Sequence, residues 1–300
     1  MGHRRGQTPI QVVSPNLCWK PNPAGENRRR GERAESDKAM AAQASNPWVG
    51  VTERDWVELQ EQGTLALQGA ALDAARVTRG TCLLDAGCGA GILGVLATLR
   101  GAQVSAVDGS PAMLRIARER LPDRDVRQAD LRQLPFAPAS FDAVVAVNSI
   151  FFTPDPAATL RELVRVTRPQ GRVVVTCWGP PERCQFTAVR QAMAPLTSPI
   201  VPPAAAEPHA LATPGALESL FQQAGWRVVD RGEVVCTMAY PDAEVAWRAH
   251  SSGGPTQAAI RARGEDTVRG VLAEVDRQFT RADGTIRFDN VFVWAAGEQA

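Results

Sequence analysis

Residues 83–94, which read Leu-Leu-Asp-Ala-Gly-Cys-Gly-Ala-Gly-Ile-Leu-Gly, constrain the fold more than any other stretch. A short apolar run ends in Asp85, and Gly87, Gly89 and Gly91 follow before an apolar helical pattern begins. This order predicts a strand, a tight turn and a helix, because glycine accepts positive φ and lets the backbone approach a ligand closely. Unpaired N–H groups in the first helical turn would face whatever lies in the turn. The loop is therefore suited to a polar, nucleotide-like ligand.

The loop alone leaves two nucleotide-binding families open. Gly89, Gly91 and Gly94 also form the G-x-G-x-x-G pattern of dinucleotide-binding proteins. Downstream, a predicted strand over residues 103–107 ends in Asp108, followed by Gly109. An acidic residue about 20 positions after such a glycine turn, at the end of the second strand, is placed to hold a ribose diol. Asp108 is therefore the predicted ribose ligand.

A helix and two further strands are predicted after Asp108. Ser110 and the proline after it predict a helix start, and this helix contains Met113. A third strand is expected over about residues 125–128, shortly before Asp130 and Leu131. The near-continuous apolar run over residues 141–147, typical of a buried parallel strand, ends in Asn148.

The ordered set from Leu83 to Trp178 resembles the class I S-adenosylmethionine-dependent methyltransferases. The stretch Asp85-x-Gly87-x-Gly89-x-Gly91 is similar to motif I of that family, and the Pro-x-Gly turn at residues 169–171 leads into a fifth strand as it does there. The resemblance points to the small-molecule branch that includes ubiquinone and menaquinone biosynthesis, and it implies S-adenosyl-L-methionine as cofactor.

The resemblance also implies roles for residues at the strand ends. Asp130 would accept a hydrogen bond from the adenine amino group, and the backbone N–H of Leu131 would meet the ring. Asn148 would lie beside the sulfonium. The cofactor-binding residues that we expect from the pattern and the resemblance together are Asp85, Gly87, Gly89, Gly91, Asp108, Gly109, Met113, Asp130, Leu131 and Asn148.

The expected fold is an α/β, doubly wound, Rossmann-like seven-stranded sheet, mostly parallel with an antiparallel last strand, plus helical lid insertions. Residues 1–46 lack apolar periodicity and are expected to form a disordered tail, with Met40 as the expected native start. The methyltransferase domain would cover residues 47–300. Its lid insertions are expected at about residues 179–213, which are rich in proline, and about residues 241–282.

Composition narrows the possible partners. A net charge of +1 argues against nucleic acid as a binding partner. No apolar run reaches the roughly 18 residues of a membrane span, so we expect a cytoplasmic protein, either a monomer or a homodimer. The six cysteines lack C-x-x-C spacing and the three histidines are far apart, so no metal site is expected. The only two lysines, Lys20 and Lys38, precede the predicted fold, which excludes Schiff-base chemistry and a Walker A motif from it.

Catalytic residues are harder to predict, because methyl transfer from an activated donor depends mainly on alignment and desolvation. Where a proton must be removed, His209 and His250 are candidates, since both fall in the expected lid segments and histidine titrates near neutrality. Tyr240, the only tyrosine, is a further candidate.

Three functions remain open at this point. The first is a methyltransferase acting on O, C or N of a small metabolite or natural product. Asn148 is followed by Ser-Ile rather than by the Pro-Pro-Tyr of methyltransferases that act on nucleobase or glutamine amides, which favours a small methyl acceptor. The second is a nicotinamide-dependent oxidoreductase, and the third is a non-catalytic protein that binds the cofactor.

Overall fold

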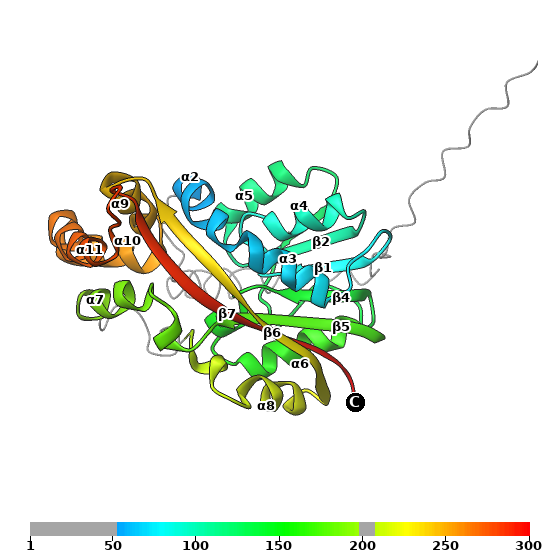
Figure 1. The fold of residues 1–300 in the computed structure, drawn as a ribbon. Helices are drawn as coiled ribbons and strands as arrows, with labels where there is room; N and C mark the ends of the chain where they lie inside the picture. The colour runs from blue at the N-terminus through cyan, green and yellow to red at the C-terminus, as the bar shows by residue number, and fades with distance from the viewer. Residues whose placement is uncertain (1–52, 198–207) are drawn as a thin grey trace, which may run out of the picture.

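The structure, a computed structural model, describes residues 53–197 and 208–300 (Figure 1). Within these ranges one sheet has the strand order β3-β2-β1-β4-β5-β7-β6. β7 is antiparallel to both of its neighbours, and the other pairs are parallel. This confirms the expected mostly parallel seven-stranded sheet. The expected tail at residues 1–46 lies outside the described residues.

The parallel strands bring their carboxyl ends to one edge of the sheet. Asp85 pairs with Ala106 and Val145, and Asp108 pairs with Gln128, so the strand ends are in register. The central strands are largely apolar because both faces of the sheet are covered. Their bounds are β1 Cys82–Ala86, β2 Gln103–Asp108, β3 Asp125–Gln128, β4 Phe141–Ala146 and β5 Thr167–Trp178.

Helices cover the sheet on both faces (Figure 1). On one face α3 (Leu65–Ala74) and α4 (Ile92–Leu99) pack on Leu83, Val145 and Val174, and α5 (Pro111–Arg120) packs on Ala106. On the other face, α6 (Pro156–Val166) and α8 (Ala216–Gln223) pack on alternate residues of the same strands, among them Leu84. The short turns η3 (Ile150–Phe152), η4 (Pro181–Arg183) and η6 (Ala210–Ala212) lie in connections near the carboxyl edge. The sheet is doubly wound, because alternate residues of its strands face helices on opposite sides.

The last two strands are the longest of the sheet. β6 (Trp226–Tyr240) and β7 (Ile286–Gln299) pair along almost their whole length, from Trp226 opposite Gln299 to Tyr240 opposite Ile286. One end of this hairpin extends past the parallel strands and carries four helices, which we call the distal helical cluster: α7 (Thr187–Thr197), α9 (Ala243–Ser251), α10 (Gly254–Arg263) and α11 (Glu265–Phe279) (Figure 1). The cluster has a core of its own, which includes Tyr240, Phe288 and Leu272.

The first described segment is a run of short helical turns: α2 (Glu53–Asp55), the π-helix η1 (Trp56–Gln60) and the 3₁₀ turn η2 (Glu61–Thr64). Gly63 falls in the 3₁₀ turn before α3 begins. Among the described residues, no helix is both long and apolar enough to cross a membrane.

β5 begins earlier than its apolar run at Arg172 suggests. Thr167 already pairs with Phe141, and the next pair is Ala143 with Arg172, so the intervening residues form an irregularity in the ladder. Gly171 is required there, because a Cβ atom on it would lie 2.6 Å from the carbonyl oxygen of Asp142. The turn expected at residues 168–171 is thus built into the strand.

Candidate functional site

The glycine-rich loop between β1 and α4 takes the left-handed backbone that its sequence requires. Gly87, Gly89 and Gly91 have φ values of +82°, +53° and +88°. The N–H groups of Gly87 and Cys88 both donate to the carbonyl oxygen of Val107, at 2.8 and 2.9 Å, which ties the loop to the end of β2. The loop is therefore a fixed turn at the carboxyl edge of the sheet.

The glycines have different steric roles. A Cβ atom on Gly87 would lie 2.3 Å from the Cβ atom of Ser149, so that position must stay bare for the loop to pack on the residue after Asn148. A Cβ atom on Gly89 would meet nothing within 4 Å, and Gly109 is equally open. Gly89 therefore leaves space next to the loop backbone, as a closely held ligand requires.

Asp108 lies at the end of β2 and orders both the loop and the next helix. Its Oδ2 accepts from the Gly89 N–H at 2.9 Å, and its Oδ1 accepts from the Ser110 N–H at 2.8 Å. Burial raises the pKa of this carboxyl above its ordinary value, and the backbone hydrogen bonds from Ser110, Gly89 and Gly109 oppose that rise. Because a carboxylate has about four lone-pair positions, Asp108 can still accept hydrogen bonds from a diol.

Asp85 is buried behind the same loop, with 1% of its surface exposed. Desolvation raises its pKa to about 8, repulsion from Asp108 adds to the rise, and a hydrogen bond from the Gly94 N–H opposes it. Its Oδ2 has no hydrogen-bond partner among the described residues. An unpaired buried carboxyl oxygen is costly, and a donor or cation from a ligand would relieve that cost.

Asp130 and Leu131 follow β3, as expected. The Leu131 side chain packs into the core on the α6 face of the sheet, whereas Asp130 is exposed. Arg132 binds the Asp130 carboxylate with two guanidinium nitrogens, Nη2 to Oδ2 at 2.6 Å and Nε to Oδ1 at 3.0 Å, and this hydrogen bonding lowers the pKa of Asp130. Asp130 therefore stays ionised and keeps its acceptor character at neutral pH.

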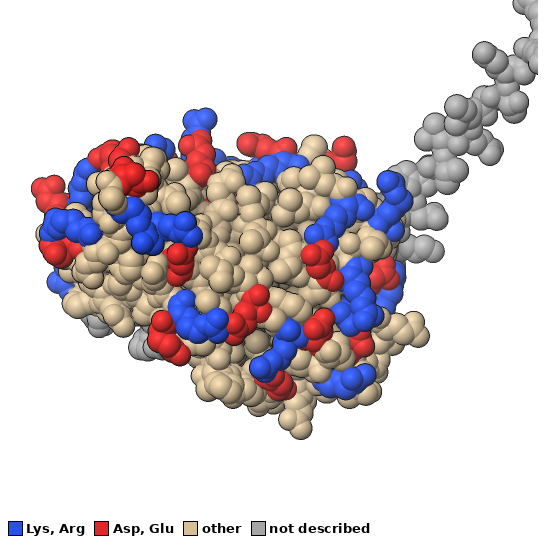
Figure 2. Space-filling model, viewed as in Figure 1, with Lys and Arg blue, Asp and Glu red and all other residues tan. Residues whose placement is uncertain are grey.

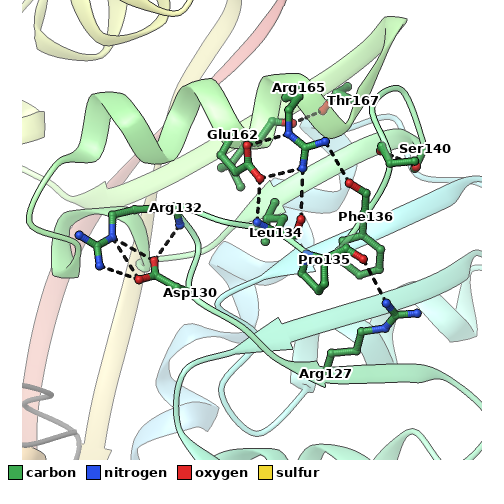
Figure 3. A network of polar contacts seen from close by, with 12 residues as sticks. Arg127, Asp130, Arg132, Leu134, Pro135, Phe136, Ser140, Glu162, Arg165 and Thr167 are labelled. Carbon is green, nitrogen blue, oxygen red and sulfur yellow. Dashed lines mark hydrogen bonds and ion pairs between the residues drawn. The ribbon is translucent and has the colours of Figure 1, made fainter. Parts of the chain in front are cut away.

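The loop that carries these two residues is held by α6 (Figure 3). The Glu162 carboxylate accepts from the Leu134 N–H at 2.7 Å, and Arg165 binds Glu162 while donating to the Phe136 carbonyl oxygen at 3.0 Å. From β3, Arg127 donates to the Pro135 carbonyl oxygen at 3.1 Å. The loop after β3 thus has a fixed path although its tip is exposed.

Asn148 lies two residues beyond β4 in the left-handed region, with φ +49°. Thr176 of β5 holds it, because the Thr176 hydroxyl accepts from the Asn148 N–H at 3.0 Å and donates to its Oδ1 at 3.1 Å. Ser149 then donates to the carbonyl oxygen of Ala86, at 2.7 Å, at the start of the glycine-rich loop. The ends of β1, β4 and β5 are thereby joined.

Met113 is buried beneath the glycine-rich loop and does not face an open site. Its side chain is buried against Ala90 of the loop, with Trp56 and Val57 of the first segment packed on the pair. The structure therefore brings together the strand-end residues of β1, β2 and β4, with Met113 supporting the loop.

The proposed proton acceptors lie farther along the molecule. The His209 Nδ1 is 2.7 Å from the carbonyl oxygen of Gly179, just after β5. His250 is in α9 of the distal helical cluster, where its Nε2 is 2.9 Å from Asp276 Oδ1. Tyr240 is buried, which raises the pKa of its hydroxyl, and it donates to Gln60 Oε1 at 3.0 Å. In this geometry Tyr240 is held as a hydrogen-bond donor within the core.

Sequence reasoning missed several supporting residues. Thr176 and Ser149 fix Asn148 and the loop, and Glu61 and Arg120 lie against the loop from outside. Ser149 could have been inferred from its place directly after the strand-end asparagine. Glu61 and Arg120 carry no signal, because charged residues in amphipathic helices are normally solvated.

Comparisons with known proteins agree with this geometry. Residues 84–175 match the family described as a methyltransferase domain. An uncharacterized Mycobacterium tuberculosis protein, Rv1405c, is 31% identical over 150 residues, which are 48% of this chain and 53% of that protein. Demethylmenaquinone methyltransferase of Renibacterium salmoninarum is 35% identical over 118 residues, 39% of this chain and 50% of the relative. The chain thus spans about half the length of these curated relatives.

A solved structure shares the fold. A Bacillus halodurans protein described as a candidate methyltransferase superposes with a TM-score of 0.53 at 16% identity, covering 77% of this chain and 98% of that one. The described residues therefore share the fold of that structure, and residues 84–175 match a methyltransferase domain.

Proposed function

We propose that the protein is an S-adenosylmethionine-dependent methyltransferase that acts on O, C or N of a small metabolite or natural product. The observation that carries the proposal is the edge where Asp85, the glycine-rich loop, Asp108 and Asn148 meet. Gly89 leaves open space there, and Asp85 keeps an unpaired buried oxygen. These features fit a ligand with an ammonium group at its amino-acid end and a ribose.

The residues divide the ligand between them. Asp85 and the glycine-rich loop would hold the amino-acid end, Asp108 and Gly109 the ribose, and Asp130 with the Leu131 backbone the adenine. Asn148 would lie by the sulfur. When bound, the cofactor supplies a methyl group already activated by its sulfonium. The chain's own work is to align that group and exclude water, which can contribute about 7 to 11 kcal/mol by proximity alone.

Of the two candidates, His209 and His250, His250 is the one we propose as hydrogen-bond or proton acceptor for the methyl acceptor, and its side chain is fully buried in the distal helical cluster. Asp276 faces Nε2, which assigns the proton of the neutral ring to Nε2, while Nδ1 has no partner among the described residues. The rings of Phe186, Tyr240 and Phe288 surround it at 5.6 to 5.9 Å between centroids. His209, by contrast, already has its Nδ1 at the Gly179 carbonyl oxygen. Wild-type turnover of His250→Gln with an identified acceptor would remove this role from His250.

The distribution of charge on the surface is also consistent with a small, apolar methyl acceptor. On the face shown in Figure 2, acidic and basic side chains are interspersed around a broad uncharged area, with no continuous basic patch. Together with the net charge of +1, this supports a small-molecule partner rather than nucleic acid. We propose a cytoplasmic monomer or homodimer, without a metal, in which residues 47–300 form the methyltransferase domain and the segments at about 179–213 and 241–282 act as its lid.

Calorimetric titration with S-adenosylhomocysteine tests the proposal. We expect binding by the wild type, at least a tenfold loss (about 1.4 kcal/mol) in Asp108→Ala, and no binding of NADH. Unchanged affinity in Asp108→Ala would contradict the ribose assignment. Binding of NADH instead would favour the oxidoreductase alternative.

The order of the strands differs from that of a dinucleotide-binding sheet. In that sheet the sixth strand continues the order 3-2-1-4-5-6, whereas here antiparallel β7 lies between β5 and β6.

Binding and catalysis are tested separately. Transfer of a labelled methyl group from S-adenosylmethionine to members of a panel of phenols, quinols, carboxylates and amines would establish the enzyme and its acceptor atom. Cofactor binding without transfer to any member would favour the alternative of a non-catalytic binding protein.

A further inference from the structure

The segment Glu53–Thr64, which we call the N-terminal strap, is bonded on two sides. On one side, Glu53 pairs with Arg115 of α5 at 3.1 Å, and Glu61 pairs with Arg120 of α5 at 2.6 Å. On the other side it meets α9, where Asp55 pairs with Arg248 and the Gln60 amide donates to the carbonyl oxygen of Ala249 at 2.9 Å. The strap therefore joins the cofactor side of the sheet to the distal helical cluster.

On the cofactor side, the strap contacts the glycine-rich loop through Arg120. The Arg120 Nη1 donates to the Glu61 carboxylate and also, at 3.1 Å, to the carbonyl oxygen of Ala90 between two loop glycines. Glu61 is 7% exposed, and burial raises its pKa while Arg120 lowers it. Trp56 packs on Ala90 as well. Arg120 thus fixes a loop peptide and the strap with one guanidinium group.

On the other side, Gln60 uses both ends of its amide. Its Nε2 donates to Ala249 of α9, and its Oε1 accepts from the Tyr240 hydroxyl at 3.0 Å, where β6 ends. Gln60 is 6% exposed and Tyr240 is 1% exposed. Breaking either bond would leave a buried polar group unpaired, which is unfavourable.

Gln60 and Glu61 are adjacent in sequence and bond in opposite directions. They lie where the π-helix η1 gives way to the 3₁₀ turn η2, and such departures from α-helix often mark functional positions. A shift of the strap that breaks one set of bonds therefore moves the other. Because the two sets meet different parts of the molecule, their states are linked.

We propose that Arg120, Glu61 and Gln60 are positioning residues that couple the distal helical cluster to the cofactor loop. The distal helical cluster holds Gln60, Gln60 holds the strap, and the strap with Arg120 holds the loop peptide at Ala90, so cofactor release is slowed from a distance. The inference rests on the proposed function, since it takes S-adenosylhomocysteine as the ligand of the loop.

The test measures the dissociation rate of tritiated S-adenosylhomocysteine chased with excess unlabelled compound. Arg120→Gln is expected to raise the rate about tenfold, equivalent to about 1.4 kcal/mol. Tyr240→Phe removes only the hydroxyl bond to Gln60 and should raise the rate at least about threefold. In the double variant the combined effect should be well below the product of the two, because both act through the strap.

Arg115→Gln is the matched control, since Arg115 is on the same helix and pairs with the strap at Glu53 through a largely exposed side chain. Its rate should stay within about twofold of wild type, as for most exposed ion pairs. If Arg120→Gln does not fold, Gln60→Met, which removes both amide bonds at similar volume, replaces it with the same expectation.

A wild-type rate in Tyr240→Phe, or fully multiplicative effects in the double variant, would overturn the coupling. No binding of S-adenosylhomocysteine by the wild type would instead overturn the proposed function. The two failures are therefore distinguishable in one assay.

Discussion

Gly89 and Gly80 have the same kind of backbone and different surroundings. Both take positive φ, +53° and +85°, and neither has an atom within 4 Å of where a Cβ would be. Gly89 faces the proposed cofactor site, whereas Gly80 lies in the turn before β1. The φ values alone predict a similar cost for alanine at each, about 1 to 2 kcal/mol of unfolding free energy.

We therefore expect Gly89→Ala to lose at least about tenfold in S-adenosylhomocysteine affinity, because the new methyl group occupies ligand space. Gly80→Ala should keep wild-type affinity at a similar loss of stability. Calorimetry together with urea unfolding checks both. Equal affinities in the two variants would mean that the ligand does not approach the loop at Gly89.

At this scale, the sequence predicted those residues whose chemistry leaves few alternatives. Alternating glycines and an acid at a strand end have few uses outside a ligand turn, and Asp85, Gly89 and Asp108 do meet at one edge. Glu61 and Arg120 gave no signal. Their burial depends on which helix packs across the loop, and that is decided by contacts between residues 59 positions apart.

The loop after β3 depends on α6, so it is best tested as an element. Glu162 accepts from the Leu134 N–H and binds Arg165 in two hydrogen bonds, and Arg165 lowers the pKa of Glu162 (Figure 3). A depressed carboxyl pKa contributes stability above the unfolded value of about 4.3, and this contribution is lost as the pH falls through the folded pKa.

Glu162→Gln should thus lower the free energy of unfolding by about 1 to 2 kcal/mol at pH 7, with the difference from wild type shrinking below about pH 4. S-Adenosylhomocysteine affinity should fall several-fold, because the loop positions Asp130. Glu218→Gln, which removes an exposed pair with Arg231, is the control and should cost no more than about 0.5 kcal/mol. Wild-type affinity in Glu162→Gln would show that this loop does not contribute to the site.

Elements were predicted well where apolar periodicity was strong. β1, β2, β3 and β4 all lie close to their expected bounds. Strands are predicted from the sequence over residues 227–237 and 286–295, and β6 and β7 are each only a few residues longer, because they pair along almost their whole length. The π-helix at Trp56–Gln60 was missed, because its bonds run to α9 and β6, which are distant in sequence.

For the whole molecule, ionisation of Asp85 has opposite effects on the free energy of unfolding and on ligand affinity. Its folded pKa of about 8 exceeds the ordinary value of about 3.9, so between these values the folded state holds a proton that the unfolded state has released. The free energy of unfolding contributed by this group therefore falls as the pH rises from about 4 to about 8. The cofactor-free protein carries its least favourable charge at the upper end of that range.

Asp85→Asn removes this titration while keeping an acceptor for the Gly94 N–H. We expect the cofactor-free variant to be more stable than wild type at pH 8, with the two converging near pH 4, in urea unfolding followed across pH. Asp73→Asn, at an exposed carboxylate on α3, should keep the wild-type dependence. The reverse order of stability at pH 8 would mean that Asp85 is not a buried cost.

Ligand affinity should change with pH in the direction opposite to stability. A ligand with a cationic ammonium group favours the ionised carboxylate, so wild-type affinity for S-adenosylhomocysteine should rise from pH 6 to about pH 8, the pKa of Asp85, whereas Asp85→Asn should bind weakly and without this rise. Calorimetry in two buffers of different ionisation enthalpy would show proton release only for the wild type. A carboxyl that destabilises the empty protein is then retained because it provides the negative charge that binds the ammonium group of the ligand.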